Sequence, residues 1–212
     1  MAPGRRRRGL GREMVGFLAG LRSDPKPLCT RGYVSSESVL FARHLGARPY
    51  QRCPPQQVAT ADAFRLVGTG PETRPGSAVG LAELQRAWVD IYAWVHAGWS
   101  PVSAGFEEPL LAGFAEDLDL IHTRVVVTST VRAAAFVFHD DEQPVVVAEC
   151  RTPSEPAGLD LLRACVRDSL LSLANQGISA IAFDGHDTDP HFRPLLDELP
   201  TTGEAFELLE WN

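Results

Sequence analysis

The stretch that decides the fold is Arg6-Arg7-Arg8-Gly9-Leu10-Gly11, close to the N-terminus. The apolar residues that follow recur at three- and four-residue spacing: Leu10, Met14, Phe17, Leu18 and Leu21. This spacing predicts a helix that starts at Gly9 or Leu10 and runs to Ser23. The first N–H groups of a helix have no partner inside the helix and carry partial positive charge. Glycines let a ligand approach the backbone, so the stretch predicts a site for a pyrophosphate, with the arginines adding charge-assisted hydrogen bonds.

The elements downstream follow in a recognisable order. Residues 24–27 contain two prolines that end the helix, and residues 28–34 are predicted to form a short strand. The serines at 35, 36 and 38 offer capping groups for a second helix, which ends at Leu45-Gly46. Residues 48–58 contain three prolines and predict at best an edge strand that runs into a linker.

Loop, helix, strand and a helix ending in Leu45-Gly46 resemble the GCN5-related N-acetyltransferase (GNAT) family. The coenzyme A loop of that family reads Gln/Arg-x-x-Gly-x-Gly/Ala, and residues 6–11 fit it position for position, with Pro3 at the family's spacing before it. The resemblance implies that Arg6, Arg7, Arg8, Gly9, Leu10 and Gly11 bind acetyl-CoA as a co-substrate. It also implies transfer of the acetyl group to an amine, carried by a small molecule or a peptide.

Two departures from the family pattern limit this assignment. Four strands precede the loop in the family, whereas only Met1-Ala2 precede Pro3 here, so we expect the chain to begin inside a first repeat. Many members use a tyrosine on the second helix to protonate the leaving thiolate, and the equivalent position is Ala42. Tyr33 and Tyr50 are not at the matching position, so the catalytic residues stay unassigned.

Residues 61–212 resemble the family in the order of their elements. Strands are predicted at 63–67, 124–128, 131–139, 144–150, 178–183 and 205–210, and helices at 81–96, 106–118, 159–175 and 192–199. The predicted fold class is α/β (α+β): a GNAT-like mixed β-sheet flanked by helices. We expect two domains, a C-terminal part of a GNAT-like domain at 1–60 and a complete but degenerate GNAT-like domain at 61–212.

The second repeat has a poor equivalent of the coenzyme A loop. Residues 151–158 lack the glycine pair, Pro153 and Pro156 have no N–H to donate, and Glu155 would repel a pyrophosphate. Glu149 ends the preceding strand, where some family members hold a general base for the amine. A carboxylate paired with Arg151 or Arg132 is the alternative that we favour.

Two further groups of residues can be interpreted as structural or as functional. Aromatic residues on and after the helix at 81–96 fit a core, and alternatively an acceptor pocket: Trp88, Tyr92, Trp94, Trp99 and Phe106. Asp184, His186, Asp187 and Asp189 resemble a metal cluster but follow a strand in a glycine-containing turn, so we expect a solvated loop and no metal.

Charge divides the chain. Residues 1–60 carry eleven Lys/Arg against three Asp/Glu, and the remaining 152 residues carry nine against 24. The basic end fits a phosphate-bearing co-substrate, nucleic acid or the acidic part of the same chain. The acidic remainder argues against nucleic acid.

No run of about 20 apolar residues and no signal peptide is present, and the four cysteines are scattered, so we expect a cytoplasmic protein without a membrane partner. The predicted function is an N-acetyltransferase; the alternative is a non-catalytic GNAT-like binding or scaffold protein that has lost turnover.

Overall fold

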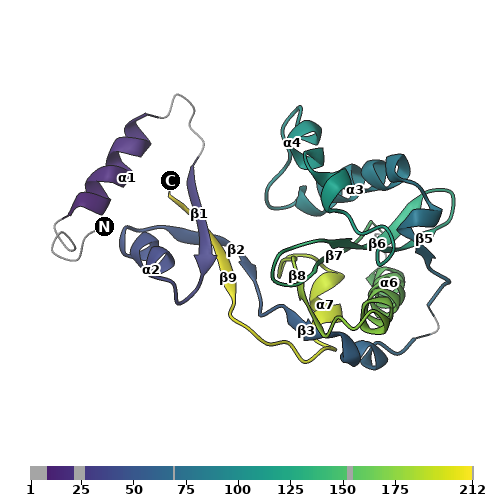
Figure 1. Cartoon of the computed structure of the whole chain (residues 1–212). Helices are drawn as coiled ribbons and strands as arrows, with labels where there is room; N and C mark the ends of the chain where they lie inside the picture. Colours follow the sequence, from purple (N-terminus) through teal and green to yellow (C-terminus); the bar gives the residue numbers. More distant parts are fainter. Residues whose placement is uncertain (1–8, 22–26, 69, 152–154, 212) are drawn as a thin grey trace. The chain divides into compact units, whose positions relative to one another are not determined.

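The chain divides into two compact units in the computed structural model, which describes residues 9–21, 27–68, 70–151 and 155–211 (Figure 1). The smaller unit joins the N-terminal part, up to Arg52, to the last residues from Phe206 onward. The larger unit is formed by Cys53–Ala205. We describe each unit by itself.

The smaller unit has a three-stranded sheet with the last strand of the chain in its middle. Its elements are α1 (Leu10–Gly20), β1 (Leu28–Tyr33), α2 (Glu37–His44), β2 (Arg48–Cys53) and β9 (Phe206–Trp211), and the strand order is β1-β9-β2. Strand β9 runs antiparallel to β1, from the pair Leu28↔Trp211 to the pair Tyr33↔Phe206. The sheet is therefore completed by a segment more than 170 residues away from β1 in sequence.

Helix α2 forms as its capping residues predict and supplies the core of this unit. The Ser36 hydroxyl accepts a hydrogen bond from the Val39 N–H at 3.3 Å and satisfies one of the free donors of the first turn. Val39 and Ala42 of α2 are buried against Leu209 of β9. The carboxylate of Glu207, also on β9, pairs with Arg43. Helix α2 is thus held to β9 by both apolar and charged contacts.

The larger unit has a six-stranded sheet in the order β3-β8-β7-β6-β5-β4. The strands are β3 (Gln57–Ala59), β4 (Arg74–Pro75), β5 (Arg124–Val127), β6 (Val131–Phe138), β7 (Val145–Cys150) and β8 (Ala180–Phe183). Neighbours run antiparallel except for β7 and β8, which are parallel and pair at Val145↔Ala182 and Val146↔Phe183. The sheet is therefore mixed, as predicted.

Helices cover both faces of this sheet. The strands β6 and β7 alternate their side chains, so that Ala135 and Ala148 face α6 (Glu155–Asn175) while Phe136 and Val147 face α3 (Leu81–His96). With α6 lie α7 (Phe192–Leu196) and the 3-10 helix η2 (Thr60–Arg65); with α3 lie η3 (Gly76–Ala78), α4 (Glu107–Leu111) and α5 (Phe114–Asp117).

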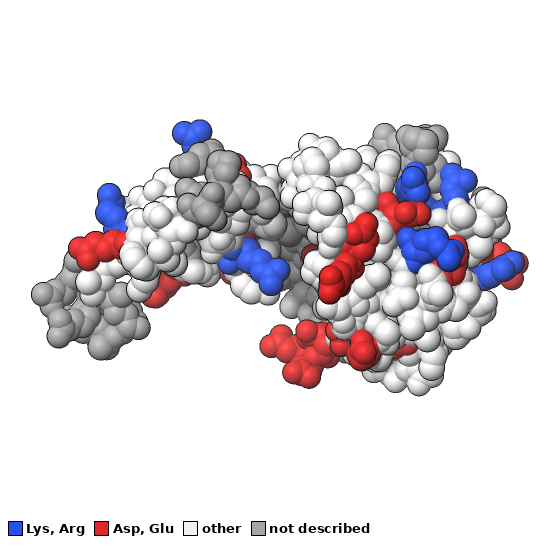
Figure 2. Space-filling model, turned by 90° about the horizontal axis from the view of Figure 1, so that it is seen from above, with Lys and Arg blue, Asp and Glu red and all other residues white. Residues whose placement is uncertain are grey.

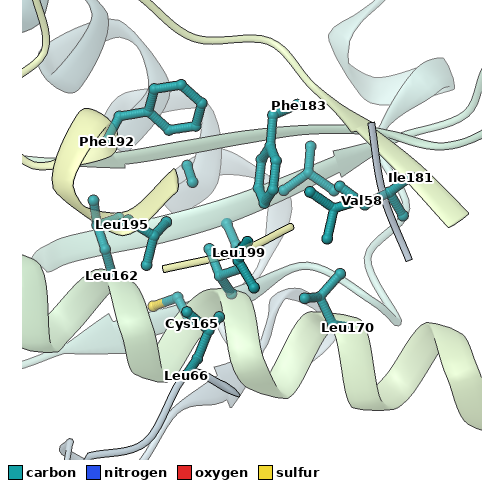
Figure 3. Close-up of a cluster of buried hydrophobic side chains, with 14 of the residues drawn as sticks. Val58, Leu66, Leu162, Cys165, Leu170, Ile181, Phe183, Phe192, Leu195 and Leu199 are labelled. Carbon is teal, nitrogen blue, oxygen red and sulfur yellow. The ribbon is translucent and has the colours of Figure 1, made fainter. Parts of the chain in front are cut away.

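The core between α6 and the sheet is packed from several elements (Figure 3). Leu162, Cys165 and Leu170 of α6 lie over Ile181 and Phe183 of β8. Apolar positions on one stripe of a long helix and on one face of a strand explain why these two elements pack together.

Three predictions of local structure need correction. Residues 63–67 form no strand: Thr60–Arg65 is a 3-10 helix, because Ala63 and Leu66, three residues apart, are both buried in the α6 core and Thr60 donates to the Ile178 carbonyl at 2.7 Å. The single helix expected at 106–118 is two short helices, separated near Gly113, which has a φ of +77°. The strand expected at 205–210 belongs to the sheet of the smaller unit, since its buried Leu209 meets α2 there.

None of the four cysteines forms a disulfide, and Cys53, Cys150 and Cys165 are buried. In the part of the chain that the structure describes, no helix is long and apolar enough to cross a membrane.

Two neighbouring leucines of α6 give a test of this core. Leu170 is 1% exposed and Leu171 is 47% exposed. Leu170→Ala removes a side chain from a packed core and should lower the free energy of unfolding by about 2–5 kcal/mol. Leu171→Ala should change it by less than about 1 kcal/mol. Urea denaturation of both variants measures the difference, and equal losses would contradict the packing described.

Candidate functional site

The predicted coenzyme A loop lies at the start of α1, as far as the structure describes it. Arg6, Arg7 and Arg8 lie outside the described residues. Gly9 is the N-cap of α1 with a φ of +81°, and its carbonyl accepts the Glu13 N–H at 3.1 Å. No side chain among the described residues caps this helix, and a Cβ added at Gly9 would meet no described atom within 4 Å. Among the described residues, none caps or covers the start of α1 at Gly9.

Gly11 has a structural reason to be glycine. A Cβ at this position would lie 2.6 Å from Cζ of Phe41, so any larger residue here would require the Phe41 ring to shift. Leu10 between the two glycines is 43% exposed. The pattern of glycines therefore serves both the helix start at Gly9 and helix packing at Gly11.

The position expected to hold a general acid is apolar. Ala42 is 2% exposed and lies in the small core with Val39 and Leu209. Tyr33 is a strand residue, as predicted, and its ring packs edge-on against Phe206 at a centroid distance of 5.6 Å. Neither residue offers a proton to a thiolate at the place where the family pattern puts the acid.

A second group of titratable side chains gathers in the larger unit, at the carboxyl end of the parallel pair β7–β8. Beyond Val146↔Phe183 the ladder between these strands stops, while β7 continues to Cys150. The chain leaving β8 then forms the loop 184–191. Ends of parallel strands where the sheet opens in this way are common positions for ligand sites.

Glu149 is the central residue of this group. It pairs in register with Ala134 of β6 and points to the α3 face of the sheet. Its side chain is buried, and its Oε2 has no hydrogen-bond partner among the described residues. Burial, together with the charges of Asp189 and Asp184, raises the pKa of Glu149 to about 8.

We expected Glu149 to pair with Arg151 or Arg132, but in the structure Arg151 pairs with another carboxylate. Arg151 pairs with Asp90 of α3, with Nη1 and Oδ2 3.4 Å apart. Glu149 and Arg151 lie on the same face of the sheet. The side chain of Glu149 is buried, whereas that of Arg151 is 54% exposed. Burial, not surface pairing, determines the charge of this carboxyl.

Histidines and aromatic rings surround the opening. His96 at the end of α3 stacks on Tyr92 at 3.8 Å between ring centroids, and its Nδ1 lies 2.9 Å from the Tyr92 carbonyl oxygen. His186 from the loop after β8 meets His96 at 5.6 Å and Trp99 at 4.8 Å. Burial lowers the pKa of both His96 and His186, so both rings are neutral at neutral pH.

Asp189 and His191 complete the group from the loop side. The Asp189 carboxylate accepts the His191 N–H at 2.7 Å and the Phe192 N–H at 3.0 Å, and so orders the start of α7. Burial raises the pKa of Asp189. His191 is 1% exposed, and neither ring nitrogen has a hydrogen-bond partner among the described residues. The prediction of a solvated loop is therefore wrong for Asp189, although Asp184 is exposed.

The aromatic stripe of α3 divides between the two interpretations. Trp88 packs on Phe114, Phe136 and Phe138 and belongs to the core. Trp94, by contrast, stacks on His191 at 6.0 Å. The meeting of His96 with His186 could not be found from sequence, because 90 residues separate them; only the i, i+4 spacing of Tyr92 and His96 gave a local signal.

The arrangement can hold and release a proton near neutral pH. A carboxyl group with a pKa of about 8 is mostly protonated at pH 7 and becomes a base just above it. Among the described residues, no group of three or more His, Cys, Asp or Glu side chains is arranged to hold a metal ion.

Comparisons with known proteins find similarity in structure alone: no family model and no curated protein matches the sequence. A GCN5-related N-acetyltransferase from Sphaerobacter thermophilus matches with a TM-score of 0.63 and 15% identity, over 99% of this chain and 70% of that one. One from Kribbella flavida matches with a TM-score of 0.54 and 16% identity, over 99% of this chain and 50% of that one. A tandem GNAT protein from the clavulanic acid biosynthesis pathway gives 0.53 and 14%, over 98% and 72%.

The buried carboxyl makes a prediction about stability. The pKa of Glu149 is about 8 when folded against 4.5 as its ordinary value, so the folded state holds more protons between these two values and loses stability as pH rises through that range. From about pH 6 to about pH 8 the loss from this group should be about 2 kcal/mol. Glu149→Gln keeps the shape without the charge, so its free energy of unfolding should fall less.

Urea denaturation of both proteins at the two pH values measures this difference. Parallel pH profiles for the wild type and Glu149→Gln would show that Glu149 does not titrate in this range.

Proposed function

The chain has the fold of the GCN5-related N-acetyltransferases, and we propose that it is an acyl-CoA-dependent N-acetyltransferase that binds its co-substrate at the start of α1. The observation that carries this proposal is the start of α1 at Gly9, which no described residue covers. No described side chain caps this helix, and Gly9 has a left-handed backbone conformation, which favours glycine. The pyrophosphate oxygens of acetyl-CoA would accept hydrogen bonds from the N–H groups of the first turn. Arg6, Arg7 and Arg8 would add charged donors.

The transfer itself is an attack of an amine nitrogen on the thioester carbonyl carbon. The carbon–sulfur bond breaks, coenzyme A leaves as a thiolate, and the proton of the amine passes to a base. Holding the two reactants together and polarising the carbonyl with backbone N–H groups supply much of the rate in such transfers. We propose a small-molecule or peptide amine as acceptor.

The larger unit is a poor place for the co-substrate. A Cβ at Gly158, in the first part of α6, would lie 2.3 Å from Nε2 of His191, so the imidazole fills the space against this turn. This supports binding at α1 and not at α6.

A non-catalytic binding or scaffold protein is the second candidate. The buried Ala42, where the family pattern has an acid, favours it. The two candidates differ in turnover: an enzyme releases coenzyme A thiol when an amine is supplied, whereas a scaffold binds without release.

Calorimetric titration with acetyl-CoA tests the proposed site. Combining Arg6→Glu, Arg7→Glu and Arg8→Glu reverses the charge next to the pyrophosphate and should weaken binding at least about tenfold. The matched control combines Arg6→Lys, Arg7→Lys and Arg8→Lys, which keep the charge and should bind within about threefold of wild type.

No binding of acetyl-CoA by the wild type would overturn the proposal, as would equal affinity of the two triple variants. Binding by the wild type without thiol release against a panel of amines would favour the scaffold.

A further inference from the structure

The loop that follows β8, residues 184–191, contacts α3 and the turn after it through aromatic rings. The imidazole of His186 lies edge to face on that of His96, at 5.6 Å between centroids, and 4.8 Å from the indole of Trp99. His96 itself lies 4.7 Å from Trp99, so the three rings form one contact group. We call this group of His96, Trp99 and His186 the latch. It joins two segments of the larger unit that are far apart in sequence.

The two ends of the loop are held by hydrogen bonds of their own. At the start of the loop, the Asp184 N–H donates to the Val146 carbonyl at 3.0 Å. At its end, the Asp189 carboxylate accepts the Phe192 N–H, also at 3.0 Å. Loss of the latch would therefore release the middle of the loop and leave both ends attached. A segment held in this way can open locally while the rest of the unit stays folded.

The contacts of the latch favour two neutral imidazoles. If both rings were protonated, two like charges would meet at the 5.6 Å contact. His96 is only 6% exposed, so water would screen this repulsion poorly and would hydrate the charges poorly. Burial accordingly lowers the pKa of both His96 and His186.

Groups near the latch favour the charged imidazoles but do not outweigh burial. The carboxylates of Asp184 and Asp187 act on His186, and that of Asp184 acts on His96. The Tyr92 carbonyl oxygen, 2.9 Å from Nδ1 of His96, acts in the same direction. The pKa of each imidazole is nevertheless lowered overall.

The remaining titratable groups of the loop and of β7 do not change this balance. Glu149 supplies little negative charge at pH 7, because its pKa is about 8. His191 lies beside Asp189, with Nδ1 4.0 Å from Oδ1, so a positive charge there would have a partner. Asp187 already pairs with Arg193 at 2.8 Å. Two positive charges would therefore meet at the latch.

Further charges of the larger unit lie at its surface. Figure 2 shows Lys, Arg, Asp and Glu side chains spread over the face that is seen from above. Water and salt screen such charges beyond about 10 Å. The groups that decide the protonation of the latch are therefore those packed against it.

We propose that residues 184–191 form a pH-sensitive lid, which closes on α3 while His96 and His186 are neutral and opens when both are protonated. Tyr92 and Glu149 interact electrostatically with Asp184 of the same loop, so opening would bring water to this group of side chains. The lid thus controls access to the end of β7. This proposal does not depend on acetyl-CoA binding or acetyl transfer.

The direction of the pH dependence follows from the two histidines. In the closed state their pKa values lie below the ordinary value of 6.5, and in the open state they return towards it. Between these values the open state binds more protons, so the closed state is favoured above pH 6.5 and is lost as pH falls through the lowered pKa values. Each histidine changes the closing equilibrium by up to about tenfold per pH unit in this range.

Hydrogen–deuterium exchange of the full chain at about pH 7.5 and about pH 5.5 tests the lid, with rates corrected for the intrinsic pH dependence of exchange. Protection of the loop 184–191 should fall at least about tenfold at the lower pH, while protection of β6 stays within about threefold. Equal protection of the loop at both pH values would overturn the proposal, as would a parallel loss in β6.

Variants that keep the rings separate the histidines from the carboxylates. His96→Phe combined with His186→Phe removes both titrating groups, so protection of the loop should be the same at both pH values within about threefold. The matched control is His139→Phe, an exposed position after β6, which should keep the tenfold fall. A fall that persists in the double variant would assign the pH dependence to a carboxyl group such as Asp189 and contradict the latch.

A measurement on the wild type decides the case if the double variant does not fold. Nuclear magnetic resonance titration of the carbon-bound ring protons gives the pKa of each histidine directly. We expect midpoints below 6.5 for both His96 and His186. A midpoint at or above 6.5 for either ring would show that the closed loop does not favour the neutral imidazole.

Discussion

Strand β9 lies between β1 and β2, and the smaller unit depends on it. Strands β1 and β2 each form a ladder with β9 and not with each other, so β9 alone joins them into one sheet. Leu209 of β9 fills the core under Val39 and Ala42, and Glu207 anchors Arg43. The helix start at Gly9 is then placed by packing of α1 on α2, for which Gly11 leaves room. The predicted binding loop at one end of the chain thus rests on a strand from the other end.

The larger unit contains a different constraint, a carboxyl group held in an apolar environment. Glu149 lies on the α3 face of β7, in the same row as Val147, which belongs to the apolar cluster. The buried Oε2 has no described partner, and the neutral histidines nearby supply no opposing charge. A group like this costs folding energy when it ionises. Such a cost is found most often where the chemistry of a site needs the shifted pKa.

Local structure could be predicted from the sequence where periodicity was strong. Helix α3 has the predicted bounds, 81–96, and β5, β6 and β7 lie within about one residue of theirs, because long apolar runs and a regular aromatic stripe define them. The mixed sheet flanked by helices and the GNAT fold are confirmed. The prediction of this fold rested on the resemblance at residues 6–11, although no family model and no curated protein matches the sequence.

The rest depended on contacts between distant segments. Nothing in residues 206–211 shows that their partners are β1 and β2. The apolar residues at 63–67 look like a strand until α6 covers Ala63 and Leu66 together. The burial of Glu149 and Asp189, and the meeting of His96 with His186, likewise need the folded loop after β8. These residues can be named as candidates from the sequence, but their pKa values depend on the tertiary structure around them.

Backbone amide signals of the isotopically labelled chain, recorded with and without acetyl-CoA, test the location of the co-substrate most directly. If the start of α1 holds the pyrophosphate, the N–H groups of residues 9–12 shift on titration, as donors to phosphate oxygens. Those at 157–160 in α6 stay in place. Shifts confined to α6, or no shifts in either helix, would contradict the assignment.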